Sequence, residues 1–153
     1  MNDMEKRYRI DELQFFYDYS DGLAIIINST TGVYYGINTF GSAIFNQLVK
    51  GVSPASVLKE LRHLSGCPLE IEDIFVNFIT RLQNFGLLIP ETTVEGNKMM
   101  QSFDQSIATE GFVFEVEEFA EIQEILLADP IHDVNNDHGW PILFGAANDF
   151  LSE

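Results

Sequence analysis

The chain has 153 residues, a length that fits one domain with an appendage, and 46% of them are hydrophobic, enough to bury a substantial core. The lone Cys67 cannot form an intramolecular disulfide, so the cysteine content gives no sign of an oxidising compartment. The first residues lack the apolar core of a signal peptide, and no apolar run approaches the ~20 residues of a membrane span. We therefore expect a cytoplasmic protein without a membrane partner.

The charge is distributed unevenly along the chain. All 8 Lys and Arg residues lie within residues 1–98, whereas residues 99–153 have none and hold half of the 24 Asp and Glu residues. A phosphate backbone repels such an acidic surface. The charge pattern therefore argues against nucleic acid as a partner.

The first predicted elements are three antiparallel strands. Residues 1–12 are charged and are expected to be loose. Alternation, β-branched residues and aromatic residues then predict strands, and Asp21-Gly22 and Gly32 supply the turn signals between them. The predicted strands cover residues 13–19, 23–28 and 33–37.

Three amphipathic helices are predicted to follow the strands. Asn38 and Ser53 are typical N-cap residues, and acidic residues in the first turn of the last helix complement its dipole. The predicted helices cover residues 39–49, 54–64 and 70–85. Residues 87–90 form a short extended segment that either covers the core or adds a strand. The sequence thus predicts an α+β domain over residues 13–90.

The remainder of the chain is predicted to be a linker, 91–111, and an acidic C-terminal extension, 112–153. Residues 112–114 are typical of a brief strand. Apolar residues then recur at helical spacing over 115–127 and predict an acidic amphipathic helix that needs a surface to lie on. The residues expected to dock on a partner are Phe119 and Ile122 on this helix and Ile131 and Trp140 beyond it.

Two runs of sequence carry a resemblance to a known family. They are GVYYGINTFGSAIFNQLVKGVSPASVLKEL at 32–61 and EIEDIFVNFITRLQNFGLL at 70–88. Three strands followed by three helices is a winged-helix-like plan, and these runs resemble the PqqD family, the small peptide chaperones whose module recurs as the recognition element of ribosomal peptide-modifying systems. The resemblance ends near residue 89, so it implies nothing about the acidic extension.

The resemblance implies a way of binding a leader peptide. The peptide would add as an extra strand to an open edge of the third strand, and its apolar side chains would enter a groove beside the third helix. The implied edge residues are Val33, Tyr34, Tyr35, Gly36 and Ile37. The implied groove residues are Phe75, Phe78, Arg81, Leu82 and Phe85. Arg81 is the only cation on that helix, and we expect it to pair with a carboxylate of the leader.

Each of these residues also has a purely structural interpretation. The spacing of Phe75, Phe78 and Leu82 is typical of any helix buried in a core. Tyr34 and Tyr35 would then only cover the sheet, and Arg81 would be a solvated cation near a helix end. The sequence leaves these alternatives open.

No catalytic arrangement stands out in the sequence. Cys67 precedes a proline in a predicted loop, with His63 on the preceding helix, and the interpretation we favour is a bystander thiol. Asp129, His132, Asp133, Asp137 and His138 include metal-binding residue types, but irregular acidic segments contain such residues by chance. We therefore expect no enzyme activity, no cofactor and no metal.

The favoured function is an adaptor that captures the leader of a ribosomally made precursor and presents it to a tailoring enzyme, of the radical-SAM type or another. The acidic extension would dock on that enzyme, on a second copy in a homodimer, or in the protein's own groove as a peptide mimic. The alternative is a winged-helix transcription regulator. Against it, the helix that would read DNA carries Glu70, Glu72 and Asp73 and one cation only.

Overall fold

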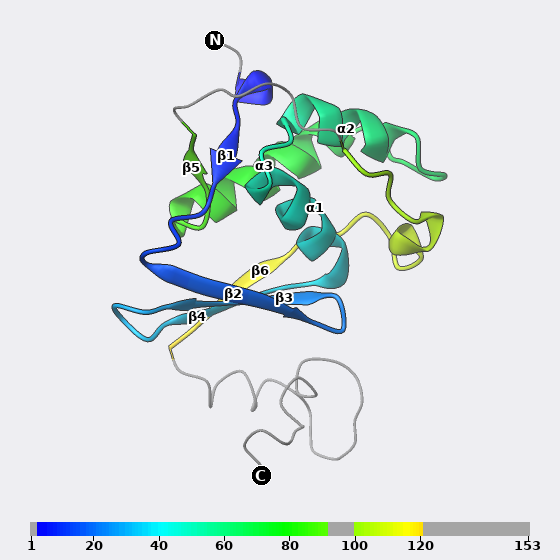
Figure 1. The fold of residues 1–153 in the computed structure, drawn as a ribbon. Helices are drawn as coiled ribbons and strands as arrows, with labels where there is room; N and C mark the ends of the chain where they lie inside the picture. Colours follow the sequence, from blue (N-terminus) through cyan, green and yellow to red (C-terminus); the bar gives the residue numbers. More distant parts are fainter. Residues whose placement is uncertain (1–2, 92–99, 121–153) are drawn as a thin grey trace, which may run out of the picture.

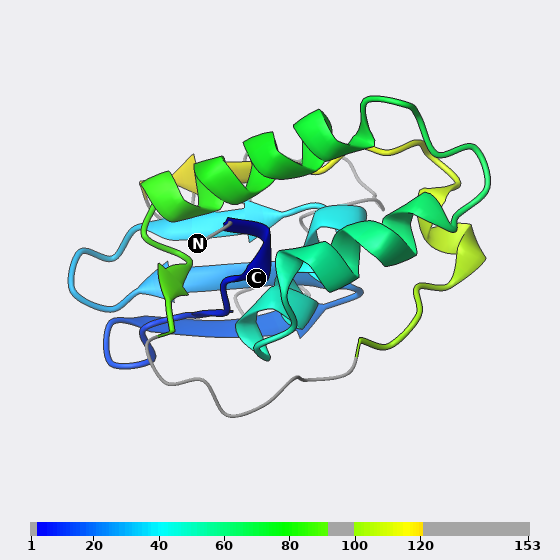
Figure 2. The same ribbon diagram turned by 90° about the horizontal axis from the view of Figure 1, so that it is seen from above.

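The computed structural model describes residues 3–91 and 100–120, which form an α+β fold with two antiparallel sheets (Figure 1). The larger sheet has four strands in the order β2-β3-β4-β6. Its strands are β2 (Phe15–Ser20), β3 (Leu23–Asn28), β4 (Tyr34–Ile37) and β6 (Val116–Phe119). Helices α1 (Thr39–Val49), α2 (Pro54–Arg62) and α3 (Ile71–Asn84) lie over one face of this sheet (Figures 1 and 2). None of the described helices is long and apolar enough to cross a membrane.

The second sheet pairs β1 (Tyr8–Arg9) with β5 (Ile89–Pro90). The expectation of a loose N-terminus is therefore wrong for the described residues: a 3-10 helix, η1 (Asp3–Glu5), precedes β1, and Tyr8 and Ile10 are buried in the core. Burial of Tyr8 and Ile10 explains the difference, because it stabilises this segment against the core although the neighbouring residues are charged. Residues 87–90 fulfil both expected roles, because Leu87 and Leu88 are buried and the next two residues form β5.

The core lies between the large sheet and the helices, and strand alternation decides which residues enter it. In β3 the buried Ala24 and Ile26 alternate with half-buried residues. They lie opposite Ile37 and Tyr35 of β4, which are also buried. These four residues lie at the centre of the sheet's contribution to the core, which also includes Phe15 of β2 and Val116 of β6.

Local capping fixes the beginnings of two helices as predicted. The Oδ1 atom of Asn38 accepts a hydrogen bond from the backbone N–H of Gly41 at the start of α1. Ser53 accepts one from Ser56 at the start of α2, where Pro54 takes the first helical position. Helix α3 begins at Ile71, one residue later than expected, and Glu70 makes no side-chain cap.

Two predictions about the sheet are wrong. The sheet has four strands rather than three, and the fourth, β6, lies within the segment predicted to be a helix over 115–127. Val116 and Phe119 are spaced as on a helix face, but both are buried in a strand whose intervening residues are exposed. The rest of that predicted helix lies outside the described residues. In the predicted linker, the described residues include a second 3-10 helix, η2 (Gln105–Ala108).

Gly41 lies where α1 comes close to the sheet and to α3. A Cβ atom at this position would lie 2.7 Å from Asn38 Oδ1, 2.8 Å from Ile37 Cγ2 and 3.0 Å from Phe78 Cζ. Gly41→Ala should lower the free energy of unfolding by about 1–3 kcal/mol through overpacking, although alanine favours helix. Urea denaturation measures this loss. A Gly41→Ala protein as stable as the parent would show that the close approach is not rigid.

Candidate functional site

The outer edge of β4 is paired with β6, so the expectation of an open edge is wrong for the described structure. The ladder is antiparallel and joins Tyr34 to Phe119, Tyr35 to Glu118, Gly36 to Glu117 and Ile37 to Val116. The strand that occupies the edge belongs to the extension of the same chain. The described part of the extension pairs with its own chain, and the three docking modes considered for the extension stay predictions. We call residues 112–119 the docked segment, and the β4 edge with its neighbouring side chains the β4 site.

An aromatic cluster anchors the docked segment before β6 begins. Phe114 is buried, and its ring lies 4.8 Å from that of Phe40 on α1 and 5.8 Å from that of Phe78 on α3. Phe112 also packs on Phe40, with ring centroids 5.4 Å apart. The docked segment therefore contacts two helices as well as the sheet edge, and burial of Phe114 gives it an apolar anchor.

Asn38 binds the docked segment through three hydrogen bonds. Its side-chain Nδ2 donates to the carbonyl of Val113 at 2.8 Å, and its Oδ1 accepts from the backbone N–H of Glu115 at 3.0 Å. The backbone N–H of Asn38 donates to the carbonyl of Glu115, also at 3.0 Å. The same side chain caps α1, so one asparagine joins the helix start to the docked segment. Sequence analysis found the cap but missed the second role.

Arg81 contacts the backbone of the docked segment. Its Nη2 donates to the carbonyl of Val116 at 2.7 Å, across from α3 to β6. This contact puts Arg81 beside the β4 site, although the residue is exposed, as expected for a cation near a helix end. Its partner in the described structure is a carbonyl oxygen, so the pairing of Arg81 with a leader carboxylate stays a prediction.

Tyr35 contacts an acidic side chain of β6. Its ring is buried against Phe85, with centroids 5.1 Å apart, and its hydroxyl donates to Oε2 of Glu118 at 3.3 Å. Burial raises the pKa of Tyr35, and the neighbouring Glu118 carboxylate raises this pKa further. The β4 site thus provides a protonated hydroxyl where β6 presents a carboxylate.

The remaining predicted groove and edge residues divide between core and site. Phe75 and Leu82 are fully buried in the core, which agrees with their structural interpretation. Phe78 is equally buried, but its ring also contacts Phe114. Val33 precedes β4 and lies outside its ladder with β6; its carbonyl accepts from the backbone N–H of Asn28.

Most of the predicted partner-docking residues lie outside the residues that the structure describes. Phe119 lies in β6 opposite Tyr34 and is buried. Ile122, Ile131 and Trp140 lie outside the described residues, and so do the Asp and His residues at 129–138 that were weighed as metal ligands. Among residues 3–91 and 100–120, no three His, Cys, Asp or Glu side chains are grouped as a metal site would need.

Packing on one side of the docked segment is incomplete. A pocket of about 570 Å³ lies between the segment, the start of α1 and η2. Asn38, Phe40, Ile107, Val113 and Glu115 are among the residues that line it. The docked segment is therefore held by a few defined contacts, beside space that no described side chain fills.

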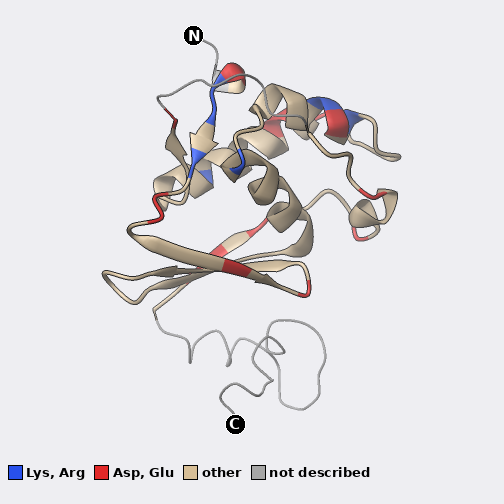
Figure 3. Ribbon diagram, viewed as in Figure 1, with Lys and Arg blue, Asp and Glu red and all other residues tan. Residues whose placement is uncertain are grey.

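The acidic residues of β6 are exposed. Glu117 and Glu118 lie at the molecular surface, and Figure 3 shows acidic residues along β6 while basic residues gather near β1 and α2. The first turn of α3 is acidic as well, with Glu72 and Asp73 exposed. Neither element offers the positive surface that a phosphate backbone requires.

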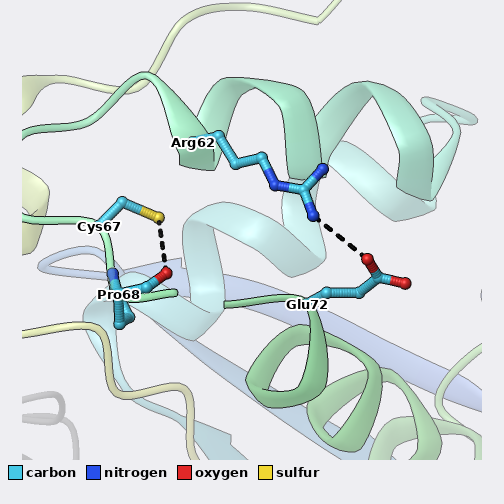
Figure 4. A network of polar contacts seen from close by, with 4 residues as sticks. All are labelled: Arg62, Cys67, Pro68 and Glu72. Carbon is cyan, nitrogen blue, oxygen red and sulfur yellow. Dashed lines mark hydrogen bonds and ion pairs between the residues drawn. The ribbon is translucent and has the colours of Figure 1, made fainter. Parts of the chain in front are cut away.

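Cys67 shows no sign of an activated nucleophile. In Figure 4 its thiol points to the carbonyl of Pro68, with Sγ and O 3.6 Å apart, while Arg62 pairs with Glu72 at 3.2 Å. Burial raises the pKa of the Cys67 thiol, which disfavours the reactive thiolate. This environment agrees with the interpretation of Cys67 as a bystander.

Substitution of Asn38 separates its two roles. Asn38→Asp keeps an oxygen that caps α1 but removes the Nδ2 donor to Val113. We expect the docked segment to lose about 1–2 kcal/mol, while α1 is retained. Faster hydrogen exchange at the β6 amides with unchanged exchange in α1 is the expected result. Ser53→Ala, which removes only the cap of α2, is the matched control and should leave β6 unchanged.

Alkaline pH should weaken the contact between Tyr35 and Glu118. The pKa of Tyr35 is raised in the folded protein from its ordinary 10.0, so the stability that the neutral phenol provides is complete below pH 10 and is lost as the pH rises through the folded-state value. Urea denaturation from pH 8 to 12 should show this loss. Tyr35→Phe should lose less stability over the same range, and an identical profile for both proteins would contradict this assignment.

Comparison of the chain with family models, curated proteins and solved structures finds no match. The PqqD-like resemblance of residues 13–90 therefore stays a prediction, and the geometry of the β4 site carries the functional argument.

Proposed function

We propose that the protein is a non-catalytic adaptor that binds an extended peptide by strand addition at β4. The peptide is the leader of a ribosomally made precursor, which the adaptor presents to a tailoring enzyme of the radical-SAM type or another. Residues 13–90 form the winged-helix-like recognition domain in this proposal. The adaptor needs no cofactor of its own, because its role is to hold and present the peptide.

The observation that carries the proposal is the antiparallel pairing of β6 with the edge of β4. An extended segment does pair with the edge of β4, and α3 supplies Phe78 and Arg81 beside it. In strand addition, main-chain hydrogen bonds give affinity and alternate side chains give selectivity. The docked segment makes both kinds of contact, so this edge has the chemistry to hold a peptide.

Occupation of the edge adds a condition to the proposal. A leader must displace β6 before it can pair with β4, since a strand edge accommodates one neighbour. The same site residues then bind either strand. A substitution such as Arg81→Ala weakens both competitors, so apparent affinity alone is a poor test of the site. The location of the bound peptide is the better test.

Peptide display on the full-length protein tests the proposal. Random 12-residue peptides are selected against the immobilised chain, and the winners are added to the isotope-labelled protein for NMR. We expect the amide resonances of β4 to shift and the β6 amides to lose protection, because the peptide replaces β6.

The opposite edge of the described sheet is the internal control. Strand β2 lies there with Phe16 exposed, so a peptide can pair at this edge without displacing β6. Peptides that shift β2 amides and leave β4 unchanged would contradict the proposal. A selection that yields no binding peptide, with the same result on a protein in which Val116→Thr loosens β6, would contradict it too.

A further inference from the structure

We infer that the guest of the β4 site is an acidic peptide with the pattern aromatic-x-aliphatic-x-acid, because the docked segment occupies the site with that pattern at residues 114, 116 and 118. This inference rests on the proposed function and deepens it. It names the chemistry of the guest, and it makes the docked segment an internal competitor of that guest.

Strand alternation defines the pattern. Phe114, Val116 and Glu118 are each two residues apart, so they share the face of the docked segment that is directed to the helices. Phe114 lies between Phe40 and Phe78. Val116 is buried opposite Ile37. These two positions accept an aromatic ring and a branched aliphatic side chain.

The third position recognises an acid. Glu118 lies opposite Tyr35 and accepts its hydroxyl at 3.3 Å. The Tyr35 ring is buried, so the hydroxyl is held at this place by the packing of β4. A carboxylate here accepts a hydrogen bond that an apolar side chain would leave unmade. The site therefore selects an acid two residues after the aliphatic position.

Arg81 and Asn38 contact the backbone of the docked segment and therefore determine the direction in which a strand binds. Arg81 donates to the carbonyl of residue 116, and Asn38 bonds to the backbone of residues 113 and 115. These contacts fix the antiparallel orientation and the register of the strand, but they leave the side chains at 113, 115 and 117 unspecified. By strand alternation the side chains at 115 and 117 lie on the opposite face from Phe114, Val116 and the Tyr35 contact of Glu118, so their positions tolerate varied residues.

The docked segment competes from within the same chain. A covalently attached strand has an effective concentration on the order of 1 mM, so a free peptide with equal contacts binds the full chain only weakly. Loosening the docked segment should therefore raise the affinity for a free peptide of the same pattern. That gain distinguishes exchange at β4 from binding elsewhere on the surface.

The test uses a fluorescein-labelled peptide of residues 111–120, GFVFEVEEFA, and fluorescence anisotropy with full-length protein. Val116→Thr in the protein keeps the β-branched shape but places a hydroxyl in a buried position. We expect this variant to bind the peptide at least tenfold tighter than the parent protein. Val113→Thr is the matched control, because Val113 is exposed, and it should bind as the parent does.

Changes in the peptide test the pattern itself. Serine at the position of Val116 should reduce binding to the Val116→Thr protein at least tenfold, whereas serine at the position of Val113 should not. Circular dichroism verifies that each variant is folded. If Val116→Thr does not fold, Phe114→Leu takes its place, because it shortens a buried anchor of the docked segment and leaves every residue of the β4 site unchanged.

The outcomes separate this inference from the proposed function. Equal binding by the loosened and parent proteins, or equal loss from both serine peptides, would overturn the inference. If display peptides bind at β4 without the pattern, the adaptor stands and the inference falls. If neither the display peptides nor GFVFEVEEFA binds at β4, the adaptor proposal falls as well.

Discussion

The backbone edge of β4 is the constraint on which the rest of the structure depends. One side of β4 pairs with β3, and Tyr35 and Ile37 from the same strand are buried in the core. An uncovered edge would leave backbone donors and acceptors unpaired next to these residues, and an open edge also invites pairing with other chains. Residues 116–119 satisfy the edge from within the chain. The position of β6 follows from this need.

The contacts around β4 divide into those that hold any strand and those that prefer a particular one. Asn38 and Arg81 bind main-chain atoms that every peptide has. The rings of Phe40 and Phe78 and the hydroxyl of Tyr35 contact side chains of the docked segment, so in the proposed function they are the groups that discriminate between sequences. Most of these residues serve the fold as well, since Asn38 caps α1 and Phe78 belongs to the core. Site and core therefore share their residues.

Local signals predicted most of the fold, and the failures involve partners distant in sequence. Strand β3 and helix α1 have the predicted boundaries, because Ile25–Ile27 and the Asn38 cap act through near neighbours. Strand β6 was missed because Val116 and Phe119 have the spacing of a helix face and lie on opposite faces of the strand that they form, and because its partner β4 is far away in the chain. For the site, Arg81 contacts the docked segment, while its predicted role in binding a leader stays a prediction. The sequence pattern could not separate Phe75, a core residue, from Phe78, which also contacts the docked segment.

The distance along the chain between Asn38 and its partners has a consequence for biosynthesis. These contacts join residues 75 and 77 positions apart, and β4 cannot pair with β6 before residue 119 has been translated. At about 5–20 residues per second, a nascent chain exposes a three-stranded sheet for several seconds after β4 leaves the ribosome. During that interval the edge of β4 has no partner from its own chain, so under the proposed function a leader made nearby meets a vacant strand edge.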